Sequence, residues 1–286
     1  MSAALVIGAT GTTGSRVVAG LVAAGVRVRG ASRRGVAVQG AVMGADVEAV
    51  RFDWGDPGSY GGVLGGGVDR VYLVPPPGTA DPAAVMLPFL RRARAEGVRR
   101  AVLLSSSAIP AGGPAVGRVH AALPGIFDEW AVLRPSWFMQ NFTGDHLHAR
   151  TARTEGVIRT ATGEGRVGFI DAEDIAAVAV RALVDERAPN ADLVITGPRA
   201  LSYGDVAAVL TEVTGRTVVH QRLTREEMAE RLAAEMPAAF AGMLADMDRA
   251  IAGGAEDRTT GTVERVTGRP PHDFRAVAER EAGGRG

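Results

Sequence analysis

The residues with the clearest chemical meaning form a glycine-rich segment near the N-terminus. Its glycines and hydroxyl-bearing residues are Gly8, Gly11 and Gly14, with Thr10, Thr12 and Thr13 between them. In such a segment the first glycine permits a tight turn, the second lets a pyrophosphate approach the backbone, and the third permits close helix packing. The helix that follows offers free N–H groups and a positive dipole to phosphate. The segment therefore predicts a dinucleotide-binding loop, with a bare structural turn as the alternative.

A second group of residues should select the cofactor. Ser32, Arg33 and Arg34 come at the end of the second predicted strand, and no acidic residue lies nearby. An acid at this place would bind the adenosine 2′-hydroxyl of NAD, whereas arginine pairs with the 2′-phosphate of NADP. We therefore expect NADP(H) as the cofactor; the alternative is a pair of solvated surface arginines.

Further cofactor contacts are expected where the next strands end, because open parallel sheets bind ligands along that edge. Asp53 could accept a hydrogen bond from the adenine amino group, or it could cap the segment after it. The other residues expected at this edge are Trp54, Val74, Pro75, Ser105 and Pro135.

The catalytic relay of ordinary short-chain dehydrogenases is missing. The chain contains no lysine, and its tyrosines are Tyr60, Tyr72 and Tyr203, so a Tyr-x-x-x-Lys pair cannot exist. The absence of lysine also excludes a Gly-Lys phosphate loop and a Schiff-base lysine. His120 follows Ser107 by 13 residues, about where that tyrosine would fall. It could donate a proton or contact substrate, or it could be a buried helical histidine without chemistry.

Other classes of function have little support. With 0 cysteines, thiolate metal sites and cysteine nucleophiles are excluded, and His146 and His148 have no evident third partner, so we expect no metal site. A net charge of +0 gives no field that would favour nucleic acid. There is no apolar run of membrane-spanning length and no basic leader before the first strand. We expect a cytoplasmic monomer or homodimer that acts on a small molecule, without nucleic-acid or membrane partners.

Apolar runs that alternate with helical patterns predict the fold. Strands are expected near residues 3–7, 26–34, 47–52, 68–74, 99–104, 130–133, 167–170 and 193–196. Alternation in units of about 30 residues is typical of an α/β protein with a Rossmann-type, doubly wound parallel sheet. We expect residues 1–135, plus about 167–186, to form the NADP-binding domain. Residues 136–166 and 187–286 would form a smaller, discontinuous, mostly helical substrate-side domain.

Several segments resemble one family. They are residues 8–14, 133–142, 168–176, 195–198 and 267–271. They resemble the NmrA-like atypical short-chain dehydrogenases/reductases, and most of all the branch of ergot-alkaloid reductases of the festuclavine dehydrogenase type. The most specific segment, 133–142, reads Leu-Arg-Pro-Ser-Trp-Phe-Met-Gln-Asn-Phe. The resemblance implies NADP binding and a substrate cleft shaped by Trp137, Phe138, Met139 and Asn141.

The missing relay favours one class of substrate. Reduction of a ketone produces an alkoxide that needs a proton, whereas hydride addition to an iminium ion gives a neutral amine directly. We therefore expect an NADPH-dependent reductase of a cyclic imine or iminium ion, in natural-product biosynthesis, with His120 at most auxiliary. The alternatives are an NADPH quinone reductase and a non-catalytic NADP(H)-sensing regulator, both of which occur in the family that the chain resembles.

Overall fold

The computed structural model describes residues 2–36, 47–79 and 81–283. The chain divides into two compact units, each built from two stretches of sequence. Unit 1 comprises Met1–Pro135 and Ala172–Val194, and unit 2 comprises Ser136–Asp171 and Ile195–Gly286. Residues 167–171, which we expected beside the first domain, thus fall in unit 2, and residues 187–194 fall in unit 1.

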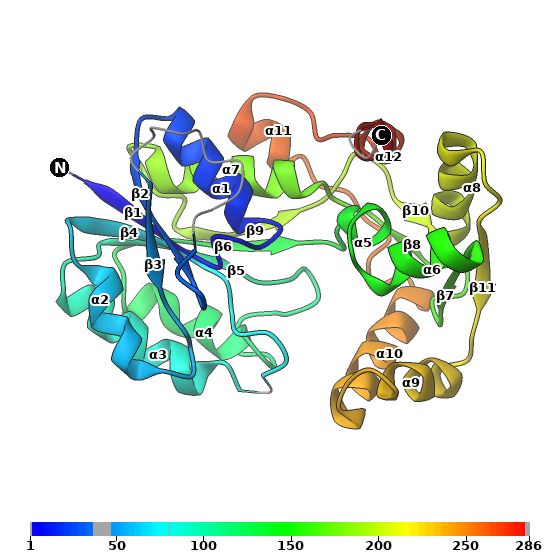
Figure 1. Ribbon diagram of the computed structural model, residues 1–286, viewed down its shortest axis with the longest axis horizontal. Helices are drawn as coiled ribbons and strands as arrows, with labels where there is room; N and C mark the ends of the chain where they lie inside the picture. Colours follow the sequence, from blue (N-terminus) through cyan, green and yellow to red (C-terminus); the bar gives the residue numbers. More distant parts are fainter. Residues whose placement is uncertain (1, 37–46, 80, 284–286) are drawn as a thin grey trace. The chain divides into compact units, whose positions relative to one another are not determined.

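Unit 1 is built on a seven-stranded sheet with the order β3-β2-β1-β4-β5-β6-β9 (Figure 1). Its strands are β1 (Ala3–Ile7), β2 (Arg27–Ser32), β3 (Val47–Arg51), β4 (Val68–Leu73), β5 (Arg100–Leu104), β6 (Glu129–Pro135) and β9 (Ala191–Ile195). The first six strands pair in parallel, and the order reverses between β1 and β4. Such a reversal opens a crevice at the carboxyl ends of the strands, which is where α/β sheets bind ligands.

The strand expected at residues 167–170 does not join this sheet. The seventh strand is β9, whereas β8 (Arg166–Val167) pairs with β10 (Leu201–Ser202) in a separate antiparallel ribbon of unit 2. A short apolar run indicates a buried strand but does not identify its partner, and this accounts for the error.

Helices cover both faces of the sheet. α1 (Gly14–Ala23) and α7 (Ala172–Val184) lie on one face, and α2 (Tyr60–Leu64), α3 (Ala83–Ala95) and α4 (Gly117–Ala122) lie on the other (Figure 1). Short 3₁₀ turns occur at Pro57–Ser59 and Leu123–Gly125. α1 buries Val17, Val18 and Leu21 at helical spacing, which is the amphipathic pattern seen in the sequence.

Unit 2 is mostly helical. Besides the β8–β10 ribbon it contains a parallel pair of strands, β7 (Val157–Thr160) and β11 (Val219–Arg222). Its helices are α5 (Gln140–Thr143), α6 (Leu147–Glu155), α8 (Tyr203–Thr214), α9 (Arg225–Ala233), α10 (Ala238–Ala252), α11 (Thr262–Thr267) and α12 (Phe274–Gly283). Ser202 and Thr224 begin α8 and α9 with reciprocal capping boxes, which satisfy backbone donors that the first helical turn leaves free.

None of the helices within the described ranges combines the length and the apolar character that crossing a bilayer requires.

Candidate functional site

Unit 1 contains a pocket of about 510 Å³ at the carboxyl ends of β1, β2 and β4, next to the reversal of strand order. We call it the unit 1 pocket. Its lining residues are Ile7, Gly8, Thr10, Gly11, Ala31, Ser32, Arg33, Phe52, Asp53, Trp54, Gly55, Val74, Pro75, Pro76, Pro77, Thr79 and Val85. Nine of the residues predicted to bind the cofactor are among them: Gly8, Thr10, Gly11, Ser32, Arg33, Asp53, Trp54, Val74 and Pro75.

The glycine loop is fixed by backbone hydrogen bonds. The Gly8 and Ala9 N–H groups both donate to the carbonyl of Ala31, each over 3.1 Å. Gly8 has a φ of +76°, a conformation that side chains rarely adopt. A Cβ on Gly14 would lie 2.1 Å from the Gly8 oxygen, so the third glycine is required by the loop itself and not by packing against the sheet. A Cβ added at Gly11 would lie 3.3 Å from that same oxygen and near no other atom of the described residues. Gly11 also lines the pocket.

The end of β2 presents unused hydrogen-bond donors. The Ser32 hydroxyl is buried without a partner among the described residues, and Ser32 and Arg33 line the pocket. Arg33 and Arg34 are both exposed, and neither guanidinium has a hydrogen bond or an ion pair within the described part of the chain. The Ser32 hydroxyl and the Arg33 guanidinium are therefore available to donate hydrogen bonds to a phosphate monoester, such as the 2′-phosphate of NADP.

Asp53 and Trp54, which come shortly after β3, line the unit 1 pocket. Asp53 Oδ1 accepts from the Gly55 N–H over 2.9 Å, which is the turn-capping role, while its side chain also lines the pocket. The Trp54 indole donates to the Val74 carbonyl over 3.0 Å, and the Tyr60 hydroxyl donates to the Trp54 carbonyl over 2.8 Å. These bonds fix the indole against the end of β4.

Six residues predicted to bind the cofactor do not line the pocket: Thr12, Thr13, Gly14, Arg34, Ser105 and Pro135. Thr13 has a specific reason, because its buried hydroxyl accepts a 3.1 Å hydrogen bond from Tyr72. Tyr72 is fully buried, and burial raises the pKa of its hydroxyl, so it remains a donor. This hydrogen bond joins β4 to the residue before α1 and so stabilises the C-terminal end of the glycine loop.

His120 is a buried residue of α4 and lies outside the unit 1 pocket. Its side chain is 5% exposed, and Nδ1 has no hydrogen-bond partner in the described structure. Burial lowers the pKa of the imidazole, Asp192 raises it and Arg134 lowers it; the net shift is downward. The imidazole is therefore neutral at pH 7, and whether His120 delivers a proton stays a question for experiment.

In unit 2, residues 137–142 lie against residues 169–171. The Ile170 N–H donates to the Trp137 carbonyl over 2.9 Å, and the Met139 N–H donates to the Ile170 carbonyl over 2.8 Å. Trp137, Phe138 and Asn141 are half-buried, whereas Met139 is only 1% exposed and packs in the core of unit 2. Burial thus makes Met139 a core residue, contrary to the expectation that it shapes a cleft.

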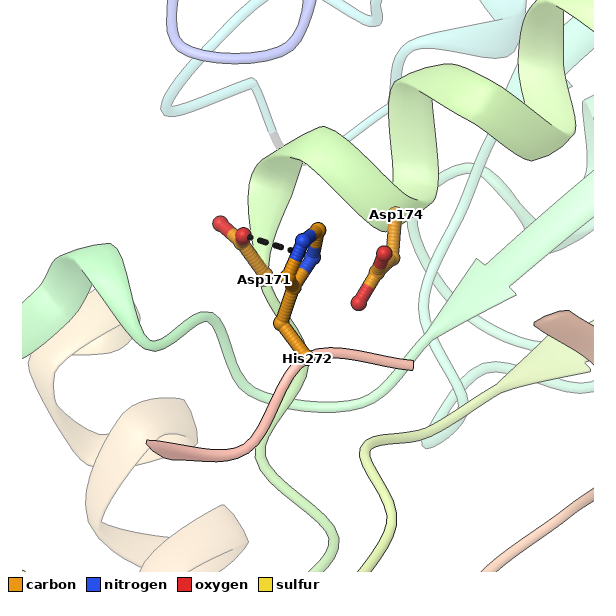
Figure 2. A group of neighbouring side chains, drawn as sticks. All are labelled: Asp171, Asp174 and His272. Atoms are coloured by element: carbon orange, nitrogen blue, oxygen red, sulfur yellow. Dashed lines mark ion pairs between the residues drawn. The ribbon is translucent and has the colours of Figure 1, made fainter. Parts of the chain in front are cut away.

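A buried carboxylate holds this region together. Asp171 is 0% exposed and accepts from Gln140 Nε2 over 2.7 Å and from Arg280 Nη2 over 2.9 Å. Figure 2 shows the third partner, His272, whose Nδ1 lies 3.2 Å from a carboxylate oxygen of Asp171. Sequence reasoning missed this network, because its members are separated by as many as 140 residues and share no motif.

The two histidines near α6 are closer than their spacing suggested. His146 precedes α6 as its cap and His148 lies in its first turn, so the His146 ring accepts from the His148 N–H over 3.2 Å. Their ring centroids are 4.8 Å apart. Because His146 lies just outside α6 and His148 lies in its first turn, two side chains that are two residues apart come together at the start of the helix.

No family model matches the chain, but individual relatives do. It is 44% identical over 279 residues to an uncharacterized oxidoreductase of Bacillus subtilis, covering 97% of this chain and 94% of that protein. It is 42% identical over 233 residues to agroclavine dehydrogenase of Claviceps fusiformis, covering 78% and 80%. The chain belongs to the NmrA-like family of short-chain dehydrogenases/reductases. Its relatives include ergot-alkaloid reductases, and it is an oxidoreductase like them.

Solved structures share the fold. The NADPH-dependent quinone oxidoreductase of Escherichia coli matches with a TM-score of 0.80 at 22% identity, covering 97% of this chain and 99% of that one. Triphenylmethane reductase of Citrobacter sp. matches with a TM-score of 0.77 at 21% identity, covering 98% of this chain and 99% of that one. Its complex with NADP(H) matches with the same TM-score at 22% identity, covering 98% and 100%. At this identity the likeness shows the Rossmann-type fold and no more.

Proposed function

We propose that the chain is an NADPH-dependent reductase that transfers hydride to a cyclic imine or iminium ion in natural-product biosynthesis. The observation that carries the cofactor half of the proposal is the end of β2, where the buried Ser32 hydroxyl and the Arg33 guanidinium have no described partner. The relatives support this class of substrate, since they include a festuclavine synthase of Penicillium roqueforti, 41% identical over 235 residues.

The residues of the unit 1 pocket fit NADP(H) in a definite orientation. Gly11 and the N-terminus of α1 would take the pyrophosphate, because no side chain blocks the backbone there. Ser32, Arg33 and Arg34 would take the 2′-phosphate, and Asp53 and Trp54 would border the adenine. The nicotinamide supplies hydride when the coenzyme is bound.

The substrate half of the proposal rests on what the site must supply. Hydride addition to a C=N⁺ carbon forms a C–H bond, and the π electrons become the lone pair of a neutral amine, so no proton has to be delivered. A ketone would need one, and a positioned proton donor is worth about 10²–10⁴-fold in rate. The chain has no Tyr-x-x-x-Lys pair, and His120 is buried and neutral. An iminium ion, or a cyclic imine that is already protonated when it binds, therefore suits this site better than a ketone does.

Substrate orientation is assigned to the half-buried residues after β6. Trp137 and Phe138 are aromatic, and an aromatic face can stabilise an iminium cation before transfer. Asn141 adds a hydrogen-bonding amide. Holding the reacting carbon near the hydride donor can itself supply much of the barrier reduction.

The experiment is a panel of substrates, and the loss of NADPH absorbance measures the rate for each of them. Cyclic imines, matched cyclic ketones and quinones are compared at equal concentration. We expect kcat/KM for imines to exceed that for matched ketones by at least about 100-fold, the contribution of a missing proton donor. Ketone turnover at or above imine turnover contradicts the proposal.

The same panel also distinguishes a quinone reductase and a non-catalytic sensor from an imine reductase. Faster turnover of quinones than of imines identifies a quinone reductase, a function favoured by the name of the E. coli structural neighbour. An NAD(P)H azoreductase of Xenophilus azovorans, 33% identical over 287 residues, points to reducible aromatic acceptors in the same way. Tight NADPH binding with no turnover of any substrate identifies a sensor.

A further inference from the structure

Unit 2 has a pocket of its own. It has a volume of about 230 Å³ and is lined by Phe142, Thr143, Ala152, Arg153, Leu210, Thr214, Arg216, Val218, Ala278, Glu281 and Ala282. All of these residues belong to unit 2, and none lines the unit 1 pocket. We call it the unit 2 pocket; the proposed hydride transfer does not use it.

The base of the unit 2 pocket is apolar and well packed. Five side chains, each no more than 9% exposed, come from α5, α6, α8, α12 and the residue before β11; they are Phe142, Ala152, Leu210, Val218 and Ala278. An apolar cavity of roughly 150 Å³ is enough to hold benzene. A pocket of about 230 Å³ therefore has room for one substituted aromatic ring.

The rim of the unit 2 pocket favours an anion. The Arg216 guanidinium has no hydrogen bond or ion pair to any described residue, and the Arg153 guanidinium donates from Nη1 to the Gly144 carbonyl over 2.8 Å. The acidic group on the rim, Glu281, has its carboxylate 3.6 Å from Arg280. Two arginines with donors unused by the described residues thus line the pocket beside one carboxylate, Glu281, whose arginine neighbour Arg280 also pairs with Asp171 over 2.9 Å.

We infer that the unit 2 pocket binds a small aryl carboxylate, with its ring on the apolar base and its carboxylate at Arg216 and Arg153. Apolar burial supplies affinity for the ring, and charge-assisted hydrogen bonds select the head group. A wall hydroxyl adds to this, because Thr143 Oγ1 is buried and has no partner among the described residues. This inference is independent of the substrate proposed for hydride transfer.

The test uses phenylacetate as the probe, titrated into the full-length protein and followed by amide chemical shifts in NMR spectra. A fragment of this size should bind with a Kd on the order of 0.1–1 mM, with shifts concentrated at the lining residues. Phenethylamine, which has the same ring with a cationic head, should bind at least about tenfold more weakly. Equal or tighter binding of phenethylamine overturns the inference.

Three variants separate the head-group contact from general effects. Arg216→Met should weaken phenylacetate about three- to tenfold, because it removes an exposed charge-assisted contact. Arg187→Met, at an exposed arginine of unit 1, is the matched control and should leave the Kd unchanged. Glu281→Gln should tighten phenylacetate and leave phenethylamine weak.

A fourth variant tests the location. Ala282 is exposed at the mouth, so Ala282→Phe should block phenylacetate without disturbing the core, and NADPH affinity should stay at its original value as a check on folding. Absence of saturable binding, or binding that neither Arg216→Met nor Ala282→Phe weakens, contradicts an aryl carboxylate site here.

Discussion

The Nε2 atom of Gln140 donates a 2.7 Å hydrogen bond to the carboxylate of Asp171, which is fully buried. The other carboxylate oxygen accepts from Arg280 of α12 over 2.9 Å. Gln140 lies between Phe138 and Asn141, two of the residues that we assign to substrate orientation, so one buried carboxylate joins their segment to the last helix of the chain. A buried charge is tolerated only when it is paired and hydrogen-bonded, and Gln140 and Arg280 meet that requirement here.

Asp171→Asn should therefore destabilise the protein. It leaves Arg280 without its partner and breaks the network, and removal of one member of a buried pair costs about 3–5 kcal/mol. Because the Arg280 side chain is 35% exposed, we expect a value near the lower limit, about 3 kcal/mol. Urea unfolding of the purified protein measures it.

The matched control for this substitution is Asp246→Asn. Asp246 pairs with Arg225 over 2.9 Å at the surface, with side chains 60% and 34% exposed. Exposed pairs contribute about 0–1 kcal/mol. If the two variants lose equal stability, the buried network does not have the role assigned to it.

Removing the two arginines after β2 should change coenzyme selectivity. A double variant, Arg33→Ala with Arg34→Ala, loses charge-assisted bonds worth roughly 1.5–3 kcal/mol, so NADPH should bind at least about tenfold more weakly. NADH has no 2′-phosphate, and its affinity should not fall. Calorimetric titration of both coenzymes measures this, and an unchanged preference for NADPH would show that the arginines are only solvated surface groups.

The glycine loop offers a contrast between two positions. Gly11→Val should abolish NADPH binding while the protein still folds, because the side chain would enter the pyrophosphate position. Gly14→Ala should lower stability as well, since its Cβ would lie 2.1 Å from the Gly8 oxygen. Gly62→Ala, on α2 with nothing within 4 Å of the added carbon, is the control. Normal NADPH affinity in Gly11→Val would disprove the assignment of this loop to phosphate.

The fold and most of the lining of the unit 1 pocket were predictable because their signals are local. Strand, glycine turn and helix follow one another within residues 3–23, and polar residues at strand ends mark one sheet edge. Pro76, Pro77 and Thr79, which also line the pocket, were missed, although Pro75 beside them was predicted.

What could not be predicted depends on tertiary contacts. The roles of Thr13 and Met139 are decided by burial: one hydroxyl is bonded to Tyr72, and one thioether packs in the core of unit 2. Neither the Asp171 network nor the unit 2 pocket leaves a pattern in the sequence, because each gathers residues from distant segments. The missing lysine, in contrast, excluded a relay without any structure.

Two buried groups of unit 2 should give the stability opposite dependences on pH. Burial, with smaller effects from His146, His220 and Arg231, lowers the pKa of His148 to about 3. Its stabilisation is present above about pH 6.5 and is lost as pH falls toward 3. Burial raises the pKa of Asp248 to about 6, so its contribution is present at low pH and is lost as pH rises through 6.

Variants at these two positions separate the effects by urea unfolding between pH 4 and 7. His148→Gln should gain stability relative to the original protein as pH falls, by up to about 1.4 kcal/mol per pH unit. The relative stability of Asp248→Asn should change the other way, being greatest near pH 7. Parallel curves for either variant contradict the assigned pKa shift.

The last prediction concerns His120 and the chemistry of transfer. Its imidazole is buried, its lowered pKa keeps it neutral at pH 7, and it does not line the unit 1 pocket. His120→Asn should therefore leave kcat for a cyclic imine within about threefold between pH 6 and 8, because hydride addition to an iminium ion calls for no proton donor. Thermal unfolding of the same sample confirms that the variant remains folded at the assay temperature. A loss of about 100-fold or more in kcat, with KM and folding unchanged, would mean that His120 delivers a proton in the transition state. A carbonyl would then be a better substrate assignment than an imine.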